Sequence, residues 1–234
     1  MQSFPEPQER AVYAGAQLHH GVAKFMNGVY GWMSVGLAVT AAVSLLVAQS
    51  PAAVAMIYGT PLRWVAFLGP LAFVWFLAAK VHTMDRPLAL GCFLAYAAML
   101  GVALAYVPLV YSAVSILGIF VVTAAMFAGL ALFGWTTKKD LTGWGSFLFM
   151  AVIGIVIAAV VNMFVMSSAL GFGISAIAVL VFAGLTAYDT QKLKQLYLMH
   201  GGAGNLAILG ALELYLDFLN LFLSLLRLFG SRDD

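Results

Sequence analysis

The sequence predicts an all-α integral membrane protein with about seven transmembrane helices, and three observations predict this class. Hydrophobic residues make up 64% of the 234 residues. Only 9% of the residues are charged, whereas soluble domains carry about a quarter. The apolar residues gather in runs close to the roughly 20 residues that a helix needs to cross a bilayer. A soluble globule could not cover so much apolar surface, so we expect a single membrane domain.

The predicted spans are separated by Pro, Gly and charged residues, which break the apolar runs. The last span differs from the others because polar residues interrupt it. Short loops join the spans, and the tightest contains Pro108, which suits a turn better than a helix interior. The predicted spans cover residues 27–48, 64–81, 88–107, 112–135, 144–164, 168–189 and 206–229.

Basic residues predict the orientation, because they favour the cytoplasmic side of short loops. Three of the 11 fall on one side of the predicted spans, namely Arg63, Arg227 and Arg232. The other eight fall on the opposite side: Arg10, Lys24, Lys80, Arg86, Lys138, Lys139, Lys192 and Lys194. We therefore expect a cytoplasmic N-terminal segment over residues 1–26, a seven-helix membrane domain over 27–230 and a short C-terminal tail over 231–234.

Several classes of function find no support in the sequence. The net charge of +2 is small and scattered, whereas nucleic-acid binding requires a basic patch or stripe. Cys92 is the only cysteine and lies in an apolar span, where it is expected to act as a small buried hydrophobe. The four histidines show no metal-ligand spacing, and no phosphate-binding or nucleophilic serine motif occurs. We expect no cofactor and no nucleic-acid partner. The lipid bilayer is the expected partner.

The last span carries polar residues where a lipid-facing helix would have none. Their spacings of four, three, four and three residues place them on one face of a helix. A surface helix with a solvated face would give the same pattern, but the remaining face is too apolar and too long for that. Ionisable groups within spans usually mark a functional path. The five residues are Glu213, Asp217, Asn220, Ser224 and Arg227, and we expect Glu213, Asn220 and Ser224 to line an ion path.

Asp189 follows the sixth apolar run directly. It is either a carboxylate at headgroup level or a partner of Asp217 at similar depth, because spans six and seven are antiparallel neighbours. Two carboxylates in a poorly hydrated site cannot both ionise cheaply, so they share a proton and can sense pH. When both are ionised they can bind a cation, and hard oxygen ligands suit calcium. The few ligands, with Asn220 as a third, predict the weak binding that conduction requires.

Four segments of the chain carry a resemblance to one family: residues 29–37, 133–155, 184–194 and 209–230. Together they resemble the Bax inhibitor-1 family. The resemblance implies six helices around a central seventh and a calcium leak controlled by pH through aspartates at the positions of Asp189 and Asp217. In some members a basic residue on span two latches the closed state; Lys80 is the nearest candidate here, and Arg63 lies at the other end of that span. A lysine-rich tail is absent, which indicates a bacterial member in the cytoplasmic membrane.

The sequence also allows functions other than a calcium leak that responds to protons. One is a membrane interaction protein that regulates a partner such as a membrane protease, without conduction. Intramembrane aspartyl proteases also carry a Tyr-Asp pair like Tyr188 and Asp189, but their second aspartate follows Gly-x-Gly. Here the sequence is "LYLD" ending at Asp217, so we expect no enzyme. A proton-coupled transporter is a further alternative, although the chain lacks the internal repeats of many transporters.

Overall fold

The computed structural model describes residues 7–202 and 205–232. Residues 1–6 and 233–234 lie outside this part of the chain, and with them the outer ends of the predicted N-terminal segment and C-terminal tail. Within the described residues the regular elements are all helical, apart from an isolated bridge between Tyr111 and Arg232. The helices are α1 (Pro7–Ala48), α2 (Pro51–Tyr58), α3 (Leu62–Lys80), a 3-10 turn η1 (Val81–Thr83), α4 (Arg86–Ala103), α5 (Val107–Val110), α6 (Ala113–Thr136), α7 (Trp144–Val165), α8 (Ser168–His200) and α9 (Leu206–Phe229).

The predicted all-α membrane fold is confirmed. Among the described residues, 7 stretches are long and apolar enough to cross a membrane. They belong to α1, α3, α4 with α5, α6, α7, α8 and α9, and each corresponds to one predicted span. The predicted turn around Pro108 contains α5, a single helical turn with this proline near its start.

Two helices run further than the apolar runs predicted. α1 begins at Pro7, well before the predicted start at residue 27, and α8 continues past residue 189 to His200. Gln, Lys and Leu are good helix formers, so the polar segment after residue 189 continues the helix instead of ending it. α8 stops at Gly201, whose φ of 64° is the left-handed conformation that glycine adopts without strain.

Serine side chains cap three of the described helices at their N-termini. The hydroxyl oxygen of Ser112 accepts a hydrogen bond of 3.3 Å from the backbone N–H of Ser115 at the start of α6. Ser50 and Ser167 cap α2 and α8 in the same way. Each cap satisfies a backbone donor that the first turn of a helix leaves without a partner.

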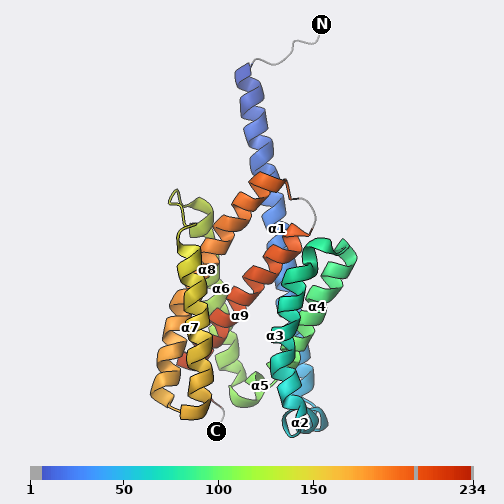
Figure 1. Ribbon diagram of the computed structural model, residues 1–234, viewed down its shortest axis with the longest axis vertical. Helices are drawn as coiled ribbons and strands as arrows, with labels where there is room; N and C mark the ends of the chain where they lie inside the picture. Colours follow the sequence, from blue (N-terminus) through green and yellow to red (C-terminus); the bar gives the residue numbers. More distant parts are fainter. Residues whose placement is uncertain (1–6, 203–204, 233–234) are drawn as a thin grey trace.

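α9 occupies the middle of the bundle and is inclined to its neighbours (Figure 1). In its most apolar stretch 61% of the residues are buried, against at most 39% in the other spans. It contacts α1, α4, α6 and α8. In contrast, α3 packs mainly on α4, and α7 packs mainly on α8. The predicted central C-terminal helix is therefore observed.

A buried hydrogen-bond network joins α9 to α1 and α4. The hydroxyl oxygen of Tyr215, which is fully buried, lies 2.6 Å from that of Thr40 on α1. The Thr40 hydroxyl in turn lies 2.9 Å from the carbonyl oxygen of Ala97 on α4. Buried hydroxyl groups cost free energy unless they are paired, so this network helps to fix the three helices against one another.

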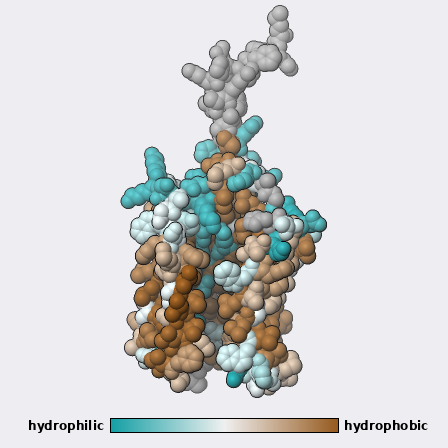
Figure 2. All heavy atoms as spheres, in the orientation of Figure 1, coloured by the Kyte–Doolittle hydropathy of each residue, from teal (hydrophilic) through white to brown (hydrophobic). Residues whose placement is uncertain are grey.

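Hydrophilic residues gather at the end of the bundle where α1 enters, and hydrophobic residues cover most of its sides (Figure 2). This end holds the junctions between α3 and α4, between α6 and α7, and between α8 and α9 (Figure 1). Seven basic residues of the described chain lie at or near these junctions or on the first turns of the α1 span: Lys24, Lys80, Arg86, Lys138, Lys139, Lys192 and Lys194. We call it the basic end.

Candidate functional site

The structure brings Asp189 of α8 and Asp217 of α9 together inside the bundle. Their exposed fractions are 8% and 4%, and their carboxyl groups lie within hydrogen-bonding reach of each other. α8 and α9 meet here because the short connection after Gly201 sends the chain straight back along α8. Since α8 continues to His200, Asp189 lies within the helix instead of at its end.

A lysine and a third acid complete the cluster toward the basic end. The Lys192 ammonium lies one helical turn from Asp189, with 3.5 Å between Nζ and Asp189 Oδ1. The same Nζ donates a hydrogen bond of 2.8 Å to Oε1 of Glu213 on α9. Lys192 therefore bridges α8 and α9, and its side chain keeps an exposed fraction of 35%.

Two carboxylate oxygens of this cluster lack a donor. Among the residues that the structure describes, none donates a hydrogen bond to Asp217 Oδ2 or Glu213 Oε2, and both atoms are buried. Buried acceptors are nearly always satisfied by protein or water. A proton shared with Asp189 would satisfy the carboxyl group of Asp217, whereas Glu213 Oε2 would need a donor of its own, such as water.

The cluster holds more negative than positive groups. Three carboxyl groups, from Asp189, Glu213 and Asp217, act on one another here, and Lys192 forms ion pairs with two of them, Asp189 and Glu213. Charges interact strongly in a poorly hydrated interior. A proton or a cation would reduce the excess negative charge, but no group of three or more His, Cys, Asp or Glu side chains among the described residues is placed to hold a metal ion.

The other polar residues of α9 bond to their own helix. The Asn220 side-chain amide donates to the carbonyl oxygen of Leu216 at 2.8 Å, and the Ser224 hydroxyl donates to that of Asn220 at 2.6 Å. Ser224 is buried, whereas Arg227 is exposed. The structure thus places Asn220 and Ser224 along α9 beyond Asp217, on the side away from Glu213.

The two candidate latch residues lie apart from the aspartates. Lys80 and Arg63 are exposed at opposite ends of α3. The Arg63 guanidinium lies 5.5 Å from the centre of the Trp64 ring. Within the described part of the chain, the ion pairs within 4.0 Å are both made by Lys192. Lys192, instead of a residue of span two, supplies the cation beside Asp189.

Sequence reasoning missed Lys192 and its neighbour Gln191, because it ended the sixth span at residue 189. The Gln191 amide donates to the carbonyl oxygen of Lys139 at 2.9 Å and accepts from the Leu141 N–H at 2.8 Å. It thereby fixes the loop between α6 and α7 against α8. The spacing of three residues between Asp189 and Lys192 was a usable signal, since such residues share a helix face.

Comparison with known proteins identifies the family. A family model described as "Inhibitor of apoptosis-promoting Bax1" matches residues 22–234. This chain belongs to the Bax inhibitor-1 family. The match covers all seven spans, and both aspartates lie within it.

Relatives within the Bax inhibitor-1 family cover nearly the whole chain. The inner membrane protein YbhL of Escherichia coli is 45% identical, over 91% of this chain and 93% of its own. An uncharacterized protein of Deinococcus radiodurans is 43% identical over 91% and 92%. An uncharacterized membrane protein of Streptococcus pyogenes is 33% identical over 91% and 95%. Together with the seven spans, these relatives show that this family member is a membrane protein.

Proposed function

We propose that this protein is a calcium leak whose ion path is closed by a proton shared between Asp189 and Asp217. The observation that carries the proposal is the pairing of these two carboxyl groups within the bundle, with Asp217 Oδ2 buried and without a donor. Two carboxyl groups can form a hydrogen bond only when one of them is protonated. A shared proton therefore holds α8 and α9 together at this point.

Loss of that proton would leave two ionised carboxylates in contact, which repel each other in a poorly hydrated site. The pair can then separate or take up a cation. Carboxylate oxygens are hard ligands that suit calcium, with water filling the remaining positions. Because few protein ligands converge, calcium is bound weakly and can move on. We therefore expect calcium flux to rise as pH rises.

Lys192 and Glu213 define the side from which ions and protons reach the pair. They lie on the side of the basic end, and the partial exposure of Lys192 gives contact with solvent. On the other side the path would follow Asn220 and Ser224 along α9. With the basic end in the cytoplasm, as basic residues favour, the protein would sit in the bacterial cytoplasmic membrane with its N-terminus inside the cell.

The test is calcium flux into liposomes that hold the purified protein, measured from mildly acidic to mildly alkaline pH. We expect flux to increase with pH in the wild type. Asp217→Asn keeps the size of the side chain and its hydrogen bonding, but the amide does not titrate. In this variant we expect flux that no longer depends on pH.

Asp140→Asn is the matched control, since Asp140 is an exposed aspartate in the loop between α6 and α7. The hydroxyl and N–H of Thr142 both donate to its carboxylate, at 2.6 Å and 2.9 Å, and these bonds lower the pKa of Asp140. Asp140 thus stays ionised throughout the series, and its variant should retain the wild-type pH profile.

Two results would overturn the proposal. One is wild-type flux no greater than that of empty liposomes at every pH, which would favour a membrane interaction protein that regulates a partner such as a membrane protease. The other is an unchanged pH profile in Asp217→Asn. In that case the pH response would originate elsewhere in the protein.

A further inference from the structure

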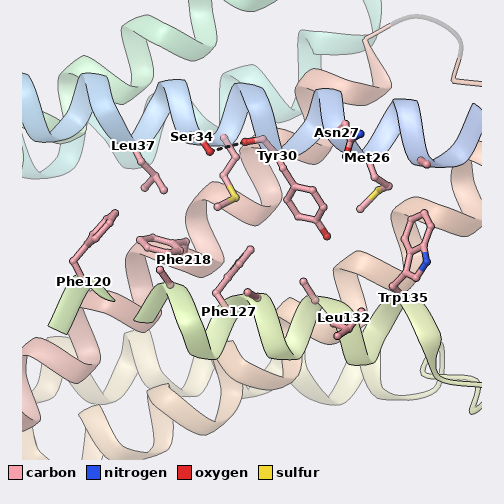
Figure 3. A pocket seen from close by; sticks show the side chains of 15 residues that line it. Met26, Asn27, Tyr30, Ser34, Leu37, Phe120, Phe127, Leu132, Trp135 and Phe218 are labelled. Carbon is pink, nitrogen blue, oxygen red and sulfur yellow. Dashed lines mark hydrogen bonds between the residues drawn. The ribbon is translucent and has the colours of Figure 1, made fainter. Parts of the chain in front are cut away.

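A groove between α1 and α6 lies apart from the aspartate pair. It is a cavity of about 560 Å³ whose walls come from α1 and α6 and whose floor includes Phe218 of α9. Figure 3 shows side chains of α1 and α6 pointing toward each other across it, with Trp135 at one end and Phe120 at the other. A second cavity of about 330 Å³ adjoins it and shares Leu37, Phe120 and Phe218.

The lining of the groove is suited to an acyl chain. Most of the side chains that face it are apolar, among them Met26, Leu37, Phe127 and Leu132. The hydroxyl of Ser34 is satisfied by the backbone carbonyl oxygen of Tyr30 at 2.8 Å, so it offers no unpaired donor. In a bilayer an opening between two spans is next to hydrocarbon, and such a surface favours acyl chains over water.

The groove is long enough to hold an acyl chain across one leaflet. Its wall on α1 runs from Ala23 to Leu37, which at about 1.5 Å per residue is roughly 21 Å along the helix axis. Half of a hydrocarbon layer measures about 15 Å. A chain that enters beside Ala23 therefore reaches the bilayer midplane near Met33, which is about 10 residues along the wall, and the groove continues past it to Leu37.

One lysine contacts a residue at the basic end of this groove, and three exposed lysines lie close to its lining residues in sequence. The Lys194 ammonium donates a hydrogen bond of 3.0 Å to the carbonyl oxygen of Trp135 and lies 5.3 Å from the centre of its ring. Among the described residues, no carboxylate lies within 4.0 Å of Lys194, because both ion pairs belong to Lys192. Lys24 is exposed on α1 directly after Ala23, and Lys138 and Lys139 follow Trp135 closely.

From these features we infer that the groove is a binding site for an anionic phospholipid. One acyl chain lies between α1 and α6, and the phosphate group lies beside Lys194 and the edge of Trp135. Tryptophan is enriched at headgroup level, and basic pockets between spans bind acidic headgroups. The inference is independent of calcium conduction, because it depends on the groove and on the charges at its end.

The test counts the lipids that stay bound to purified protein in native mass spectrometry, after mixing with phosphatidylglycerol or phosphatidylcholine of identical chains. We expect the wild type to retain phosphatidylglycerol preferentially. Lys194→Gln should reduce this preference about fivefold, the effect of one cation near an acidic headgroup. Arg86→Gln removes an exposed cation at the start of α4 and should leave the preference unchanged.

A second pair of variants tests the acyl chain. Ala128 lines the groove, whereas Ala125, one turn earlier on α6, is exposed outside the lining. Ala128→Trp should fill the groove and reduce retention of both lipids, and Ala125→Trp should not. Equal retention of the two lipids by the wild type would overturn the inference. So would equal retention in the two tryptophan variants.

Discussion

α6 packs closely against α8 but stands apart from α1. Toward α8 the backbones approach closely: a Cβ atom on Gly134 would overlap the carbonyl oxygen of Ala187. Toward α1 the helices stand apart, and the groove described above separates them. On its other side α8 packs along α9, where Asp189 and Asp217 are buried and Lys192 and Glu213 are partly exposed.

The difference between these two interfaces shows where tight helix packing is required in a membrane protein. Ionisable groups within a bilayer are costly unless they pair or face a hydrated cavity, so the helices around Asp189 and Asp217 pack tightly. A groove lined by apolar side chains has no such cost, because lipid can fill it. Packing density in this bundle therefore follows the chemistry of each interface.

The largest expected effect is a difference in stability between substitutions on the two faces of α6. Gly134→Leu should lower the free energy of unfolding by about 3 kcal/mol, because α6 and α8 would have to move apart. Ala128→Leu, on the groove side, should change it by less than about 1 kcal/mol, since the added atoms enter open space. Unfolding in mixed detergent micelles measures both values. Equal losses would show that the two interfaces are packed alike.

A smaller effect is expected from the ion pairs between α8 and α9. Lys192→Met should cost about 2 kcal/mol, the scale for losing hydrogen bonds to charged groups, because Asp189 and Glu213 lose their cation. The partial exposure of Lys192 keeps the loss from being larger. Lys138→Met, at an exposed lysine, is the control and should change stability by less than about 0.5 kcal/mol.

Adding Glu213→Gln to Lys192→Met sharpens this prediction. The double variant should recover part of the lost stability, because one uncompensated carboxylate is removed. If it is less stable than the single variant, the carboxylate of Glu213 has a stabilising partner other than Lys192.

The smallest expected effect concerns Ser224 on α9. Its hydroxyl donates to a carbonyl oxygen of its own helix, so Ser224→Ala should change the free energy of unfolding by less than about 0.5 kcal/mol. The same variant in the liposome assay tests the predicted lining role. A change in calcium flux at unchanged stability would support a path along this face. A loss of about 2 kcal/mol would instead indicate that Ser224 bonds to another helix.

The spans could be predicted from the sequence because a bilayer requires long apolar helices with satisfied backbones. The boundaries of α6, α7 and α9 fall within about two residues of the predictions, since Pro, Gly and polar residues mark them clearly. The end of α8 did not follow from hydropathy. Hydropathy detects where lipid contact ends, whereas a helix continues as long as its backbone bonds and side chains allow.

Asp189 and Asp217 could be identified as a candidate pair from the sequence, because Asp217 interrupts an apolar run, Asp189 directly follows one, and the two spans are antiparallel neighbours. The sequence also determined the class of the fold and the stripe on α9. The tertiary structure decided which cation lies beside the aspartates and where a groove remains open. Such features depend on the rotation and separation of packed helices, which are set by many weak contacts between distant segments, and a pattern along one helix does not contain that information.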